Sequence, residues 1–152
     1  MAYKINDFKT IDDVIKYLSQ FKKPYAALEG SRSITHEVAE KMEKIAKILV
    51  TTLPNLIVRS GNAVGSDIAW AKGVNSVAPE RLELFVPQKK APKKHIISGN
   101  RVITMSDINP DYLEYARNVS CENYLSTDGR RSGKTAWDKL RHYQQIYLIR
   151  DV

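Results

Sequence analysis

The sequence contains Gly30-Ser31-Arg32-Ser33 and, further on, Ser60-Gly61-Asn62-Ala63-Val64-Gly65-Ser66-Asp67. Each stretch follows a short apolar run, 24–28 or 56–59, that is typical of a buried strand, and each precedes a helical pattern. Strands that alternate with helices predict a parallel sheet with right-handed crossovers. We therefore predict an α/β fold, a Rossmann-like parallel sheet flanked by helices.

Helix signals surround these turns. Thr10 and Asp13 form a capping box for a helix that reaches about residue 20 and flanks the sheet. Thr35 is a natural N-cap for the next helix. The apolar face of that helix is expected to comprise Val38, Met42, Ile45, Ala46 and Leu49.

The remaining elements complete a single predicted domain, 1–152. A third helix is expected from Ser66 to Lys72, ending at Gly73, with strands at 82–86 and 101–105. Asn109-Pro110 and Thr135 each predict the start of a helix. The predicted domain has an N-terminal flanking helix at 8–23, an α/β core at 24–105 and a helical tail at 106–152.

Charge, hydropathy and cysteine content indicate which classes of protein the sequence is compatible with. The net charge of +7, from 24 Lys plus Arg and 17 Asp plus Glu, favours either anionic partners or good solubility. No stretch is apolar enough for a membrane span or a signal peptide, which predicts no membrane association and a cytoplasmic location. Cys121 is the one cysteine, and the histidines are scattered, so we expect no disulfide and no metal site.

The two Gly- and Ser-rich turns are the candidate binding site. Glycine lets backbone approach a ligand, and the first amides of a helix are unpaired donors at the positive end of a dipole, which suits phosphate. Asp67 either holds a ribose hydroxyl or fixes its loop by capping. The candidate ligand-binding residues are Gly30, Ser31, Arg32, Ser33, Arg59, Ser60, Gly61, Asn62, Ala63, Gly65, Ser66 and Asp67.

Two basic segments are candidate polyanion contacts, although a solvated loop explains either of them. The first contains Lys89, Lys90, Lys93 and Lys94. The second contains Arg130, Arg131 and Lys134, in the stretch Gly129–Thr135, which differs from a P-loop because Asp128 stands where glycine is needed. Glu29 and Asp67 are acidic residues near the site, but nothing in the sequence fixes their separation, so we assign no catalytic residue.

The residues 30–35, 59–69 and Gly73 resemble the SLOG superfamily, and within it the DprA-like (DNA-processing protein A-like) Rossmann proteins of the short phage type. The resemblance covers roughly 24–86. Leu28 and Asn62 stand where that family commonly has glycine. The Pro-Gly-Gly-x-Gly-Thr signature of its phosphoribohydrolase branch is absent, which favours binding over catalysis.

The resemblance implies a ligand derived from a nucleotide and no further cofactor. The first expectation is a sensor or sequestering protein, such as a phage counter-defence protein, and the alternative is a recombination accessory protein that binds single-stranded DNA. A nucleotide N-glycoside hydrolase is a second alternative. Because the resemblance stops before the family's further strands, we also expect a homo-oligomer or a partner chain that completes the sheet.

Overall fold

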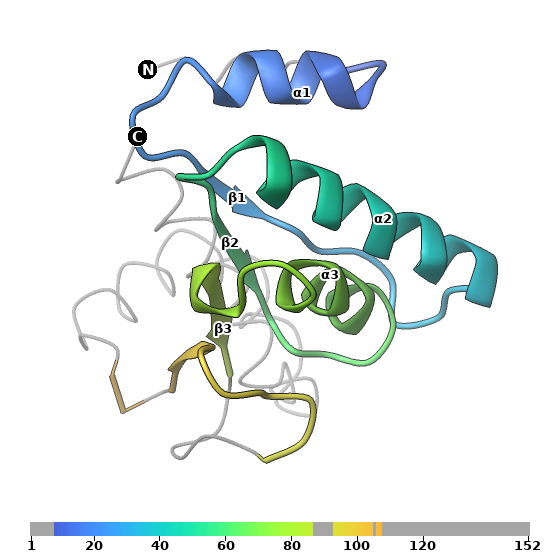
Figure 1. The fold of residues 1–152 in the computed structure, drawn as a ribbon. Coiled ribbons are helices and arrows are strands. Elements are labelled where there is room, and N and C mark those ends of the chain that lie inside the picture. Colours follow the sequence, from blue (N-terminus) through green and yellow to red (C-terminus); the bar gives the residue numbers. More distant parts are fainter. Residues whose placement is uncertain (1–7, 87–92, 105, 108–152) are drawn as a thin grey trace, which may run out of the picture.

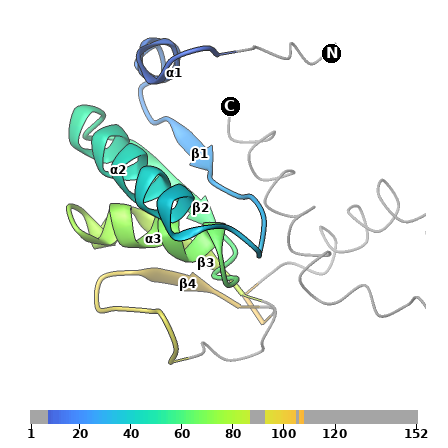
Figure 2. The same ribbon diagram turned by 90° about the vertical axis from the view of Figure 1, so that its right-hand side faces the viewer.

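The computed structural model describes residues 8–86, 93–104, 106 and 107. Its centre is a sheet in the order β1 (Tyr25–Ala27), β2 (Ile57–Ser60), β3 (Leu82–Phe85) and β4 (Arg101–Ile103). Every neighbouring pair of strands is parallel (Figures 1 and 2). The predicted α/β fold with a parallel sheet is therefore confirmed. The short strands at 24–28, 56–59 and 82–86 are each found within one residue of their predicted place.

Both crossover helices, α2 (His36–Thr52) and α3 (Ser66–Asn75), cover the same face of the sheet (Figure 2). This follows from the strand order, because successive crossovers of one hand that step in one direction place their helices on one side. A doubly wound Rossmann sheet instead reverses its strand order at a switch point. The described strands contain no such reversal.

The core lies between these helices and the sheet. Its strand side chains alternate with those on the opposite face, as the pleat requires. The fully or almost fully buried side chains are Leu49, Val50, Leu56, Val58, Val74, Leu82, Leu84 and Val86. The apolar strand segments that the sequence predicts to be buried therefore supply the strand side of this core.

The N-terminal helix α1 (Ile11–Leu18) begins with the predicted capping box. The Thr10 hydroxyl accepts from the Asp13 amide at 3.2 Å, and the Asp13 carboxylate accepts from the Thr10 amide at 3.1 Å. Leu18 joins the core cluster, and α1 contacts α2. Hydrogen bonds from the Thr10 side chain and backbone hold the pKa of Asp13 below its ordinary value.

Helix α2 is capped by Thr35 as predicted, but its predicted buried face is partly wrong. Ala46 and Leu49 are buried, whereas Val38 and Ile45 are each 38% exposed. The buried side also includes Val50. The apolar arc of α2 is therefore wider than the strip that the sheet and α3 can cover, and its Val38 and Ile45 edge is left outside.

Helix α3 does not end at Gly73 but continues to Asn75. Gly73 is a packing residue, because a Cβ there would overlap the Glu43 carbonyl oxygen of α2 and lie 2.7 Å from the Ala46 Cβ. The missing side chain lets the two helices approach each other closely. The predicted helices that begin near Asn109 and at Thr135 lie outside the described residues.

Candidate functional site

The two Gly- and Ser-rich turns lie against each other. We name residues 28–34 the first turn and residues 61–65 the second turn. Ser66, at the start of α3, donates to the Ser31 carbonyl oxygen from its amide at 3.0 Å and from its hydroxyl at 2.9 Å. The parallel strands deliver both turns to the same edge of the sheet, and these bonds join them into one surface.

Glycines make this close contact possible. A Cβ at Gly30 would lie 2.6 Å from the Ser66 hydroxyl oxygen. A Cβ at Gly65 would lie 2.5 Å from the Ser31 carbonyl oxygen and 2.6 Å from that of Arg32, and Gly65 also has φ +89°. From the sequence we expected these glycines to let a ligand approach the backbone. The structure shows that they let the two turns approach each other.

The hydroxyls of Ser31, Ser60 and Ser66 are bonded within the protein. Ser31 Oγ accepts from the Ser33 amide at 3.1 Å, and the hydroxyl of the fully buried Ser60 donates to the Leu28 carbonyl at 3.2 Å. Arg32 and Ser33 are exposed. Arg32 therefore provides the exposed positive charge of the first turn.

Asp67 fixes the second turn. Its carboxylate accepts from the Ala63 amide at 3.1 Å, and the residue is only 5% exposed. Of the two roles left open by the sequence, the structure shows a bond that fixes the loop, but it is not a helix cap, because α3 begins after Gly65 with no side-chain cap. The first turn is also tied to α3, because Trp70 Nε1 donates to the Glu29 carbonyl at 3.2 Å.

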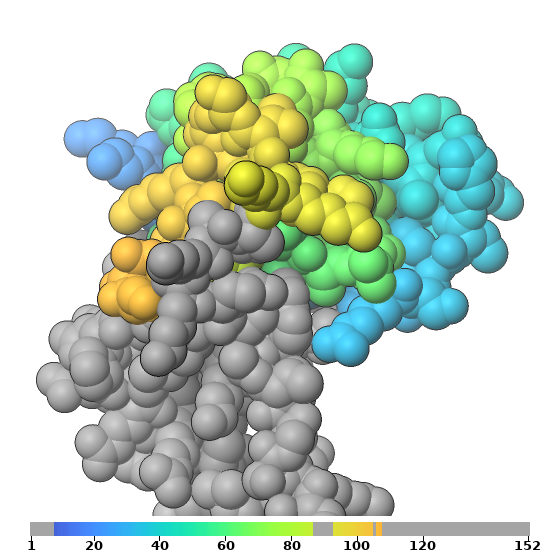
Figure 3. Space-filling model, turned by 90° about the horizontal axis from the view of Figure 1, so that it is seen from below, coloured from blue at the N-terminus to red at the C-terminus, as the bar shows by residue number. Residues whose placement is uncertain are grey.

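Asn62 links the second turn to the basic segment. Its amide Nδ2 donates to the Lys94 carbonyl oxygen at 3.3 Å, and its backbone has φ 57°, which asparagine tolerates better than most residues. Its Oδ1 is buried and has no hydrogen-bond partner. Figure 3 shows the green surface that includes the second turn between the light-blue first turn and the yellow segment that contains Lys93 and Lys94.

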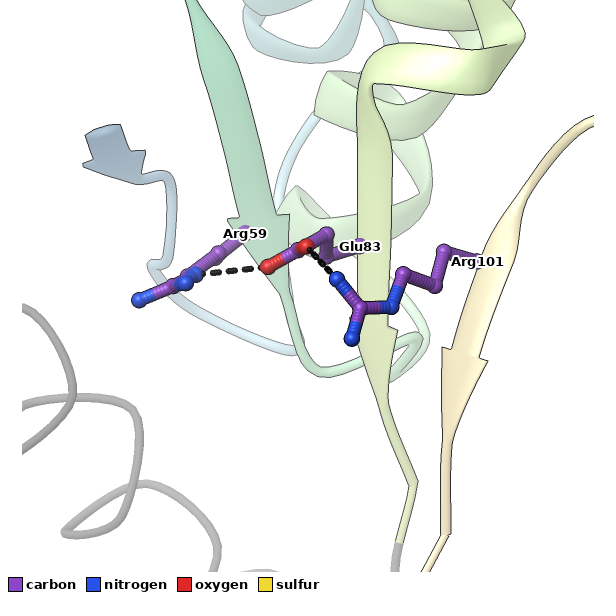
Figure 4. Close-up of polar contacts among 3 residues, drawn as sticks. All are labelled: Arg59, Glu83 and Arg101. Carbon is purple, nitrogen blue, oxygen red and sulfur yellow. Dashed lines mark hydrogen bonds and ion pairs between the residues drawn. The ribbon is translucent and has the colours of Figure 1, made fainter. Parts of the chain in front are cut away.

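The side chain of Arg59 lies on the face of the sheet opposite α2 and α3, although its backbone carbonyl accepts from the Leu28 amide of the first turn at 2.9 Å. Arg59 Nε donates to Glu83 at 2.8 Å, and Arg101 donates to the other Glu83 oxygen, also at 2.8 Å (Figure 4). The Arg59 guanidinium also stacks 4.2 Å from the centre of the Tyr25 ring. The structure therefore groups Arg59 with Glu83 and Arg101 rather than with Ser31 and Ser66.

Glu83 and Arg101 were not singled out from the sequence. The available signal was a glutamate inside the apolar run Leu82-Glu83-Leu84-Phe85-Val86, because a charge in a buried strand needs a partner. The register pairs Arg59, Glu83 and Arg101 across three strands, and only the register identifies those partners.

Several predicted residues lie outside the described part of the chain: Lys89, Lys90, Met105, Cys121, Arg130, Arg131, Lys134 and His142. Within the described part, no cluster of three or more metal-ligating side chains occurs. Among the same residues, no helix has the length and apolar character that crossing a membrane requires. The chain matches no protein-family model, no curated protein and no solved structure.

Proposed function

We propose that this protein binds a nucleotide-derived ligand at the two joined turns, as a sensor or sequestering protein without catalysis of its own. The observation that carries the proposal is the contact between Ser31 and Ser66. It brings together two turns that each lead into a helix, so the positive ends of the α2 and α3 dipoles lie beside one surface. The resemblance to the SLOG superfamily supports the choice of a nucleotide.

Charge contributes more to this proposal than free amides do. The Val38 amide is satisfied by the Thr35 hydroxyl at 3.3 Å, and the Ser66 amide by the Ser31 carbonyl. What the surface offers an anion is the guanidinium of the exposed Arg32, the ammonium groups of Lys93 and Lys94, and two helix dipoles. Guanidinium binds phosphate in a bidentate geometry, which makes Arg32 the principal proposed contact.

Mass spectrometry of small molecules released from the purified protein tests the proposal and identifies the ligand. Calorimetry with that ligand then compares Arg32→Ala with Lys72→Ala, an exposed cation in the last turn of α3. Arg32→Ala should weaken binding by about 1.5–3 kcal/mol, while Lys72→Ala should not. Equal affinities for the two variants would refute the proposed site.

Single-stranded DNA is the second candidate ligand, and the bond from Asn62 to the Lys94 carbonyl favours it because Lys94, at the end of the basic segment, adjoins the second turn. Binding of an oligonucleotide should then weaken steeply with salt, with a slope of about 0.7 per neutralised phosphate. It should also weaken when Lys89, Lys90, Lys93 and Lys94 are changed to alanine. Tight binding of a mononucleotide, without a gel shift of an oligonucleotide at low salt, would exclude DNA.

We also propose that the chain pairs with itself. Within the described residues, β1 and β4 are the edges of the sheet, and an edge strand presents unpaired backbone groups. Symmetric self-association is the commonest form of assembly. Light scattering tests this proposal: a folded monomer at micromolar concentration with full ligand affinity would contradict it.

A further inference from the structure

The two polar atoms of the Asn62 side-chain amide differ in their hydrogen bonding. Its Nδ2 donates to the Lys94 carbonyl at 3.3 Å. This bond determines the orientation of the amide, because a carbonyl oxygen needs the nitrogen as its donor. Its Oδ1 is buried and has no donor. A buried acceptor without a donor is costly, and native structures seldom keep one unless a ligand or water satisfies it.

Two neighbouring contacts hold this acceptor in place. The next residue, Ala63, donates its amide to Asp67, and Asn62 itself has the left-handed backbone conformation with φ 57°. The bond from Nδ2 to Lys94 is long for an N–H···O bond. A ligand that reaches the second turn would meet Oδ1 as an acceptor whose hydrogen-bonding capacity is unused.

We propose that Asn62 is a specificity-determining residue whose Oδ1 accepts a hydrogen bond from the bound ligand. This inference rests on the proposed function and deepens it. A fully ionised phosphate has no hydrogen to donate, so Oδ1 selects a ligand that carries a hydroxyl or an amino group besides its phosphate. A nucleotide has both, in its sugar and in several bases. The second turn thus recognises the nucleoside part, and Arg32 the phosphate.

The experiment measures the affinities of adenosine, cytidine, guanosine and uridine monophosphates, of their dideoxyribose analogues, of ribose phosphate and of sulfate, which has no hydrogen to donate at neutral pH. The wild-type protein should prefer the best nucleotide about tenfold over the analogue that lacks the donor. Loss of affinity in the dideoxy series identifies a sugar hydroxyl. Loss for uridine monophosphate, which has no exocyclic amine, together with an unaffected dideoxy series, identifies a base amine.

Two variants separate recognition from the bond to Lys94. Asn62→Gly keeps the left-handed backbone accessible and removes the acceptor, so the preference should vanish. Asn62→Asp keeps an acceptor oxygen but has no amide to donate to Lys94. It should bind every anion more weakly, because of its charge, and yet retain the preference. A residue that only positions the loop would instead give the same preference in both variants.

The outcomes separate this inference from the proposed function. If nucleotides bind in an Arg32-dependent way but Asn62→Gly keeps the wild-type preference, the proposed role of Asn62 is wrong and the binding site stands. If no nucleotide binds better than sulfate, the ligand needs no donor and the inference is also overturned. If none of these compounds binds, both proposals fail. A crystal structure of the complex in which water, rather than ligand, occupies Oδ1 would equally refute the inference.

Discussion

Arg59 Nε and Glu83 Oε2 form a 2.8 Å ion pair between adjacent strands, with side chains only 5% and 9% exposed. Glu83 is the shared partner, because Arg101, whose side chain is 71% exposed, donates to its other oxygen. One carboxylate therefore bridges a buried and an exposed guanidinium across β2, β3 and β4 (Figure 4). Burial removes the hydration of both charges of the inner pair, so the attraction between them compensates part of the lost hydration.

Removal of one charge of this pair should destabilise the protein strongly. We expect Glu83→Gln to lower the free energy of unfolding by about 3–5 kcal/mol, because the buried Arg59 loses the carboxylate oxygen that lies 2.8 Å from its Nε. Urea unfolding measures the effect. The matched control is Glu80→Gln, since Glu80 is 67% exposed and 3.9 Å from Arg81, and it should change stability by less than about 1 kcal/mol. Similar values for the two variants would contradict the structural role of the buried pair.

Gly73→Ala should also destabilise the protein, against the usual preference of helices for alanine. In an exposed helix interior this substitution stabilises by about 1 kcal/mol. Here the new Cβ would overlap the Glu43 carbonyl and force α2 and α3 apart, so we expect a loss of about 1–3 kcal/mol. Thermal unfolding measures it, with Lys72→Ala as the exposed control in the same helix. A higher melting temperature for Gly73→Ala would show that the helices are not in close contact.

Gly65→Ala should separate the first turn from the second. Alanine is strained at φ +89°, and its Cβ would meet the carbonyl oxygens of Ser31 and Arg32. Gly99→Ala is a matched control, because Gly99 has φ +100° but its Cβ would come no closer than 3.3 Å to a neighbour, Pro79. We expect the Gly65 variant to be the less stable by about 1–3 kcal/mol and to lose ligand affinity. Equal losses in the two variants would mean that the contact between the turns contributes nothing.

The capping box makes α1 sensitive to acid. The Thr10 hydroxyl, and then the Thr10 amide, hold the pKa of Asp13 below its ordinary value of 3.8. A carboxylate with a lowered pKa stabilises the fold above its unfolded-state pKa, and this contribution is lost as the pH falls through the folded-state pKa. Thr10→Ala should therefore raise the pKa of Asp13 towards 3.8. An NMR titration of the variant tests this prediction. Asp107 is the control: hydrogen bonds from Thr104 lower its pKa, and that pKa should not change in Thr10→Ala.

The sequence predicts the elements of this fold well because they depend on local signals. Thr10, Thr35 and the apolar runs each act within a few residues, and the structure places a cap or a strand at each of them. The prediction for Gly73 was wrong because its cause is not local. A glycine near the expected end of a helix is typical of a C-cap, and only the contact with Glu43 shows that it is a packing position.

In the candidate site, too, the local features were predictable from the sequence and the long-range contacts were not. The two turns were identifiable because each follows a strand and precedes a helix. The bonds from Ser66 to Ser31 and from Asn62 to Lys94 join residues that are 35 and 32 positions apart, and no local pattern encodes them. Arg59 was assigned to the turns because it adjoins Ser60 in the sequence. The side chains of successive strand residues point to opposite faces of the sheet. Arg59 therefore pairs with Glu83 on one face, while Ser60 belongs to the other.

The strand order β1-β2-β3-β4 has a consequence for how the chain folds. Among the described strands, every ladder joins a strand to the next one in the sequence, so none of these pairings has to wait for a distant segment of the chain. Parallel sheets usually form slowly because their contacts span long loops, and loop closure costs entropy before any contact is made. Here the unit of β2, α3 and β3 can dock on the unit of β1, α2 and β2 that precedes it, and β4 can then add to β3. We expect folding to proceed as an ordered series of additions along the sheet, faster than for a reversed strand order of the same length.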